Sequence, residues 1–245
     1  MNTIFVYRQG TTERVTRIER SWLASGSSAV LWVDLEAPSI PESLLLSDTF
    51  AFHPLAVEDA LSPRERPKVE PYDGYLFIVL EAMRVFVGPS SLVTVSGGGV
   101  AAIDEMRDNV SHNPKLLGDG PLSLCHRIVD ELVDGYAASV AALGGRADAL
   151  AERAIDRPSP AVVRDLLALQ AEAAAWRRRL AAEADVIGRL ARREFIDVGT
   201  DVAFRFRDVH DHALAAGDDL TAVVDRLSAL AAAGPTLAVL GRRWI

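Results

Sequence analysis

Apolar residues follow two different patterns along this 245-residue chain, and the change falls at Pro121. In the first part, short runs rich in β-branched and aromatic residues alternate with short stretches that open with a proline. This is the pattern of strands alternating with short helices. The predicted strands are residues 4–7, 30–35, 75–80 and 92–95, and the predicted helices are residues 41–50 and 54–61.

In the second part, leucine, alanine, valine and isoleucine recur at helical spacing, with charged residues between them. Pro158 and Pro160 divide the first long helix from the second, so we predict two antiparallel helices joined by a tight turn. Thr200 would cap a third long helix over residues 201–233. The apolar stripe of such helices needs a partner, so we expect them to pack on neighbouring helices, in this chain or in other subunits.

The two patterns together predict the α/β (α+β) class. We expect an N-terminal α/β/α layered domain over residues 1–120, followed by long antiparallel helices over residues 121–233. Residues 234–245 are predicted to form an irregular tail, because Gly234 and Pro235 interrupt the helical pattern.

The stretch from residue 227 to residue 241 comes nearest to a membrane helix. A spanning helix needs about 20 consecutive apolar residues. This stretch is shorter, consists largely of weakly apolar alanines, is broken at Gly234 and Pro235, and is bounded by Arg226 and Arg242. The sequence therefore predicts no membrane span in this chain.

Composition argues against several classes of function. Lysine and arginine total 26 against 34 aspartates and glutamates, and this net charge of -8 argues against a nucleic-acid binder. An acidic balance is compatible with cation binding, although a solvated surface explains it more simply. Cys125 is the only cysteine, which excludes an intramolecular disulfide and favours a reducing cytoplasm. Ser123, Cys125 and His126 lack the strand–turn–helix setting of a nucleophile elbow, so we predict that the chain is not an enzyme.

Two sets of polar side chains are candidate metal ligands. Glu58 and Asp59 are adjacent on the predicted helix 54–61, about 100° apart around its axis, so they would serve two neighbouring sites. Asp208 and His212 are four residues apart on the third long helix and share a face, as ligands of one ion would. On spacing alone, the stronger interpretation is that both sets are solvated charges on a helix surface.

Several motifs occur in the order and spacing of a known family. The chain resembles the CorA-type magnesium channel family in HPLAVED (53–59), RPKVE (66–70) and YLFIVLE (75–81). The sequence RDVHDH (207–212) resembles the Arg-Asp-Val-Tyr-Asp-His motif that begins the family's long stalk helix. VDELVDGY (129–136) resembles a helix-opening segment of the same family. The similarity covers roughly residues 30–230.

The resemblance implies the cytoplasmic, ion-sensing part of a divalent-cation channel, including the start of its stalk helix. In that family, carboxylates from these motifs form weak regulatory sites for Mg²⁺ between neighbouring subunits of a pentamer. Co²⁺, Ni²⁺ and Zn²⁺ are the alternative ions. Carried over by motif position, the ligands are Glu58, Asp59, Asp130, Asp208 and His212. The implied partners are further copies of this chain or full-length channel subunits, which would place it at the cytoplasmic face of the cell membrane.

The chain departs from the family after Leu230, where the family would continue into two membrane helices with a Gly-Met-Asn pore motif. Three interpretations stay open. The chain is the ion-sensing domain of a CorA-like transport protein, with no pore of its own. It is a soluble paralogue that binds divalent cations or joins a full-length channel as a regulatory subunit. Or it is a structural or interaction module whose carboxylates bind nothing.

Overall fold

The chain is described by a computed structural model that covers residues 2–24, 26–63, 65–157, 159–195 and 198–241, without the side chains of residues 233–241. It divides into two compact units. The first unit consists of Met1–Leu132 and Asp185–His210, and the second of Val133–Ala184 and Asp211–Ile245. The predicted domain boundary at residue 120 coincides with the start of a long helix rather than with the boundary between the units.

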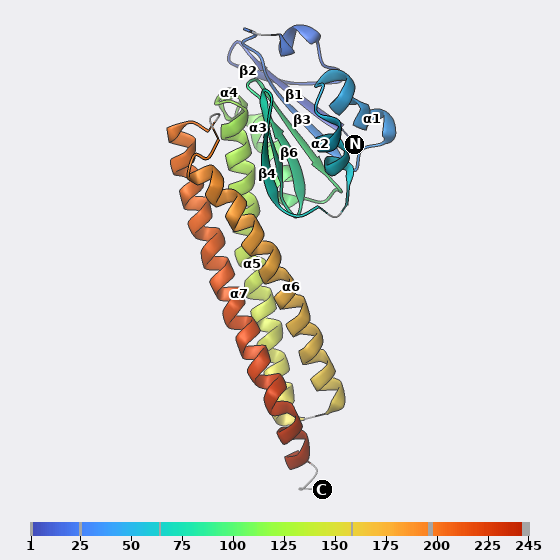
Figure 1. Cartoon of the computed structure of the whole chain (residues 1–245), viewed down its shortest axis with the longest axis vertical. Helices are drawn as coiled ribbons and strands as arrows, with labels where there is room; N and C mark the ends of the chain where they lie inside the picture. The colour runs from blue at the N-terminus through green and yellow to red at the C-terminus, as the bar shows by residue number, and fades with distance from the viewer. Residues whose placement is uncertain (1, 25, 64, 158, 196–197, 242–245) are drawn as a thin grey trace. The chain divides into compact units, whose positions relative to one another are not determined.

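A seven-stranded mixed sheet forms the centre of the first unit (Figure 1). Its strand order is β2-β1-β3-β7-β6-β5-β4; β3 and β7 are parallel, and all other neighbouring strands are antiparallel. The strands are β1 (Asn2–Arg8), β2 (Thr11–Val15), β3 (Val30–Glu36), β4 (Lys68–Tyr72), β5 (Tyr75–Val79), β6 (Met83–Val87) and β7 (Ser91–Ser96). The four predicted strands correspond to β1, β3, β5 and β7, whereas β2, β4 and β6 were not predicted.

Helices cover both faces of this sheet. On one side lie η1 (Arg20–Leu23), α1 (Ile40–Leu44) with the wider turn η2 (Leu45–Thr49), and α2 (Pro54–Leu61). On the other side are α3 (Ala101–His112) and α4 (Lys115–Gly118), both of which contact β2 at the sheet edge. The α/β layered architecture predicted from the sequence is therefore confirmed.

Strand β3 shows how the two faces are built. Because successive side chains alternate across a strand, Leu31, Val33 and Leu35 join the core that also contains residues of η2 and α2. Trp32 and Asp34 point to the opposite face, and both are completely buried. A buried carboxylate in the centre of a sheet needs a partner, and the helical layer on that side supplies one.

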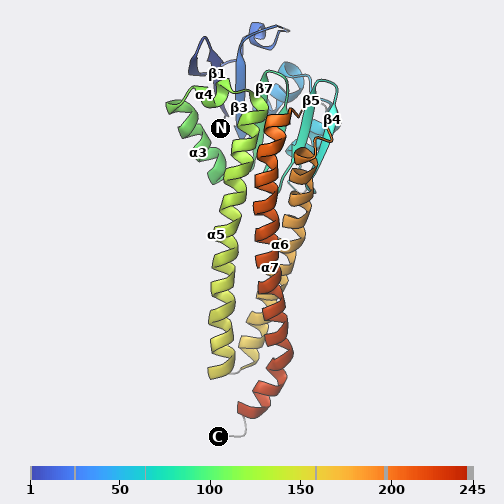
Figure 2. The same ribbon diagram turned by 90° about the vertical axis from the view of Figure 1, so that its left-hand side faces the viewer.

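Long helices form the second unit, and they are α5 (Pro121–Asp156), α6 (Pro160–Ala191) and α7 (Thr200–Gly241). Their parts in this unit lie side by side, with α5 and α6 antiparallel as predicted (Figure 2). They share an apolar core that includes Leu143, Leu166, Leu169, Leu220 and Leu227. The prediction that these helices pack on neighbouring helices is confirmed within this chain, because each apolar stripe is buried against the other two helices.

Helix α7 continues through residues 234–241, which we predicted to be irregular. The two leucines and the alanine of this stretch favour a helix, which continues although Pro235 removes one backbone hydrogen bond. The last four residues of the predicted tail lie outside the described part of the chain. Within the described residues, no helix is both long and apolar enough to cross a membrane.

Candidate metal centre

A carboxylate and an imidazole meet between two helices of the second unit. Oδ1 of Asp134 on α5 lies 3.6 Å from Nδ1 of His212 on α7, and both side chains are exposed. Asp130 comes one turn before Asp134 on the same helix, and one of its carboxylate oxygens lies within 4.8 Å of a carboxylate oxygen of Asp134. The sequence analysis predicted Asp130 and His212 as ligands but not Asp134. The spacing of four residues between Asp130 and Asp134 puts both on one helix face and could have indicated Asp134 as well.

The donors at this place fit the ions that the resemblance implies. Carboxylate oxygens are the ligands that Mg²⁺ prefers, and one or two of them usually suffice because the ion keeps several waters. The imidazole of His212 adds a nitrogen donor, which suits Co²⁺, Ni²⁺ and Zn²⁺. Donors on two helices, two of them exposed and one partly buried, would make a weak, accessible site rather than a closed structural one.

The carboxylates of α2 lie in the first unit. His53 caps this helix, because its Nδ1 accepts a hydrogen bond from the Leu55 N–H at 3.2 Å. Glu58 is exposed, whereas Asp59 is partly buried and pairs with Lys68, with 2.6 Å between Nζ and Oδ2. The Lys68 ammonium also lies 3.1 Å from Oε2 of Glu70. Burial lowers the pKa of Lys68, but the hydrogen bonds with these two carboxylates outweigh it, so the pKa is raised.

Asp208 is exposed on α7, one turn before His212 on the same helix. In the described part of the chain, it does not form a group of three candidate ligands with Glu58 and Asp59. The resemblance places these three residues at a boundary between subunits, where each chain would supply only part of a site. Their role as ligands therefore stays a prediction.

A second polar cluster lies between the sheet and α3, and it is structural. The indole N–H of Trp32 donates to Oγ1 of Thr94 at 3.1 Å, and the Thr94 hydroxyl donates to Oδ1 of Asp34 at 2.8 Å. Nη1 of Arg107 lies 3.4 Å from the other Asp34 oxygen and 3.5 Å from Glu36. Burial raises the pKa of Asp34, although Thr94 and Arg107 oppose this. Arg107 thus ties α3 to the sheet.

His126 is buried on α5, where its ring meets the ring of Phe206 edge to face at 5.1 Å. Burial lowers its pKa below the usual 6.5, although the backbone of Arg205 and the charge of Asp130 oppose this. The first unit therefore favours the neutral imidazole. The contribution of His126 to the free energy of unfolding must therefore depend on pH.

We expect the free energy of unfolding to fall as the pH drops below about 6.5, because the unfolded chain then binds a proton at His126 before the folded chain does. Above that pH the contribution of His126 is fully present. The slope should approach about 1.4 kcal/mol per pH unit until the lowered folded pKa is reached. Urea titrations between pH 5 and 7.5 measure it. His126→Gln should flatten the curve, whereas His112→Gln, on the exposed end of α3, should leave it unchanged; equal curves for both variants would contradict this.

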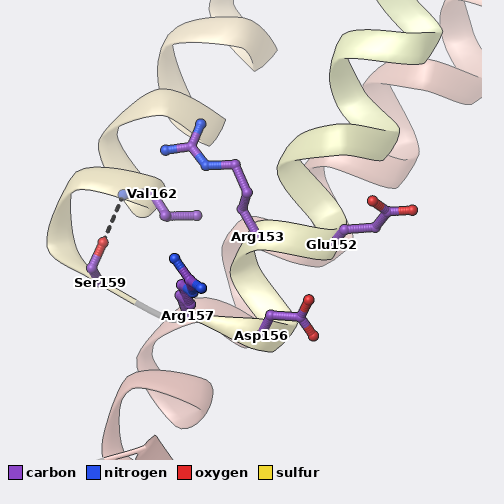
Figure 3. A pocket seen from close by; sticks show the side chains of 6 residues that line it. All are labelled: Glu152, Arg153, Asp156, Arg157, Ser159 and Val162. Atoms are coloured by element: carbon purple, nitrogen blue, oxygen red, sulfur yellow. Dashed lines mark hydrogen bonds between the residues drawn. The ribbon is translucent and has the colours of Figure 1, made fainter.

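A pocket of about 550 Å³ lies at the turn between α5 and α6. Figure 3 shows Arg153 and Arg157 extending toward the start of α6, while Glu152 and Asp156 point to the other side of α5. Arg153 pairs with Asp165 at 3.3 Å. The lining carries both signs of charge on an open surface, so it favours no class of ligand.

Residues 27–233 match the sequence model of a protein family described as "CorA-like Mg2+ transporter protein". The Bacillus subtilis protein YfjQ is 28% identical over 212 residues, which are 82% of this chain and 64% of that protein. The cobalt/magnesium transport protein CorA of Thermotoga maritima is 24% identical over 236 residues, covering 89% of this chain and 66% of the relative. The chain thus spans slightly less than two thirds of the length of either relative.

Two solved structures from Methanocaldococcus jannaschii share the fold. The complete CorA magnesium transporter has a TM-score of 0.85 and 16% identity, covering 99% of this chain and 79% of that one. The soluble domain of the same transporter has a TM-score of 0.83 and 17% identity, covering 96% and 97%. At this identity the structures establish the fold, while the family follows from the sequence match over most of the chain. The chain belongs to the CorA-like Mg2+ transporter protein family.

Proposed function

We propose that this chain is the cytoplasmic ion-sensing domain of a CorA-like transport protein for Mg²⁺ and related divalent cations. It works as part of a homo-oligomer, a pentamer by resemblance, in which cation binding between subunits controls gating. The described residues contain no helix that could line an ion path across a membrane. We expect no enzymatic activity from it.

The observation that carries the proposal is the pairing of Asp134 with His212, with Asp130 one turn away on the same helix. Two of these three residues were picked out by motif position in the sequence. Cobalt and magnesium are the ions named for the relative from Thermotoga maritima. Both suit the donors, since oxygen ligands fit Mg²⁺ and an added imidazole fits Co²⁺.

The regulatory step follows from charge. In the apo state, Lys68 offsets only one of the two charges of Asp59 and Glu70, so this group keeps one net negative charge. It would face Asp208 of the next subunit as a like charge and push the boundary apart. A bound divalent cation supplies two positive charges that Asp59 and Asp208 share. The closed arrangement is then favoured only while the cation concentration is high, which makes the boundary a two-state element biased by an ion.

A structural or interaction role without ion binding is the second candidate. One contact favours it: Asp59 already has a cation at 2.6 Å, the ammonium of Lys68. If that pairing is permanent, α2 needs no external ion. The following comparison of variants separates the two candidates.

Asp59→Ala combined with Asp208→Ala is expected to abolish the protection of the chain by Mg²⁺ against proteolysis. The double variant removes a carboxylate from each side of the proposed boundary, so the ion no longer holds the subunits together. Limited digestion with and without Mg²⁺ measures the effect. Glu105→Ala combined with Asp219→Ala, exposed carboxylates on α3 and α7, is the matched control and should keep the protection. Protection that survives in the first variant would remove Asp59 and Asp208 from the site.

A further inference from the structure

The ammonium of Lys68 lies against the Asp59 carboxylate, a ligand of the proposed site. Its Nζ is 2.6 Å from Oδ2 of Asp59 and 3.1 Å from Oε2 of Glu70. It also lies 5.9 Å from the centroid of the Phe77 ring, whose negative face attracts cations. These contacts connect α2 with the edge strand β4, and they hold one positive charge between the carboxylates of Asp59 and Glu70.

The charged group at this position is unusual for the chain. Lys68 and Lys115 are its only lysines, and its other permanently basic side chains are all arginines. A lysine ammonium is a compact point charge on a flexible stem, whereas a guanidinium forms a planar fork that holds a carboxylate in two places. Lys68 can therefore leave one carboxylate for another by a small rotation of its side chain.

We propose that Lys68 is an internal competitor for the divalent cation: it occupies Asp59 in the apo state and moves to Glu70 when the ion binds. This inference rests on the proposed function, because it takes Asp59 to be a ligand. Lys68 thereby sets the affinity of the sensor, and Glu70 is the carboxylate that receives the displaced ammonium.

The geometry supports an exchange rather than simultaneous binding. At 2.6 Å the ammonium uses a lone pair of Oδ2, and a second cation bound to the same carboxylate would be repelled by it. Glu70 already contacts the same nitrogen, so its charge stays paired after Asp59 is given up. Both side chains are partly exposed, which leaves room for this movement, since Lys68 and Asp59 keep 29% and 25% of their side-chain surface.

Amine labelling of the wild-type chain tests the exchange directly. With two lysines, each acetylation site is read separately by mass spectrometry, and exposed Lys115 on α4 serves as the internal control. Saturating Mg²⁺ is expected to raise the labelling rate of Lys68 severalfold, because the ammonium loses its closest partner, while the rate of Lys115 stays the same. A Lys68 rate that does not change while Mg²⁺ demonstrably binds would overturn the exchange.

Substitutions provide a second test of the competition between Lys68 and Mg²⁺. Lys68→Met should raise the affinity for Mg²⁺ by about tenfold, the effect of removing one charge in direct contact. Lys115→Met should leave the affinity unchanged. Asp59→Asn separates this inference from the proposed function. If Asp59→Asn weakens Mg²⁺ binding but Lys68→Met does not tighten it, only the competition is wrong. If Asp59→Asn has no effect, Asp59 is not a ligand and both the competition and its role in the proposed function fail.

Discussion

Replacing Arg107 with alanine is expected to lower the free energy of unfolding by about 3–5 kcal/mol, because it leaves a buried carboxylate without its counter-charge. Asp34 has no exposed surface, and its Oδ2 has no hydrogen-bond donor among the described residues. Only the Arg107 guanidinium compensates that oxygen, at 3.4 Å. The loss is measured by urea denaturation followed by circular dichroism at neutral pH.

Two further variants make this expectation specific. Asp34→Asn in the Arg107→Ala background removes the charge but keeps the shape, and it should recover most of the lost stability. Arg146→Ala is the matched control, because its pair with Glu172 is exposed and solvent screening should make its loss a small one. A loss in Arg107→Ala as small as that of the control, or no recovery with Asp34→Asn, would contradict the role assigned to the Asp34–Arg107 pair.

The strands that were predicted from the sequence are those in which apolar residues dominate, because such a composition indicates burial. The run at 75–79 is apolar throughout and forms β5, which is covered on both faces. Strand β2 is half exposed and largely polar, and β4 contains Pro71, so neither has the pattern of a strand. Helix α3 was overlooked although Ala102, Ile103, Met106 and Val110 recur at helical spacing, since the charged residues between them obscured the stripe.

The candidate site was only partly predictable, because the sequence pattern of one helix does not show which residues of another helix it contacts. Spacing along one helix placed Asp208 and His212 on a shared face, and motif position pointed to Asp130. The neighbour of His212 is Asp134, which lies 78 residues earlier on another helix, and only the packing register of α5 on α7 brings the two together. Lys68 is a similar case, because its contact with Asp59 depends on how α2 sits beside β4.

The largest functional effect that we expect is association of the chain when Mg²⁺ is added. The site proposed at Asp59 and Asp208 takes carboxylates from two subunits, so cation binding there and subunit contact are linked and each must strengthen the other. Without divalent cations, the net negative charge that Asp59 and Glu70 keep beside Lys68 and the charge of Asp208 oppose contact. A shift from a small species to a larger one should therefore depend on Mg²⁺ and disappear with a chelator.

Sedimentation velocity with millimolar Mg²⁺, and again with a chelator at equal ionic strength, tests this claim most directly. Equal ionic strength matters because screening alone weakens repulsion between exposed charges. A larger sedimentation coefficient with Mg²⁺ that returns to the smaller value with the chelator is the result we predict. The same coefficient in both conditions, across a range of protein concentrations, would contradict an ion-sensing role for the boundary between subunits.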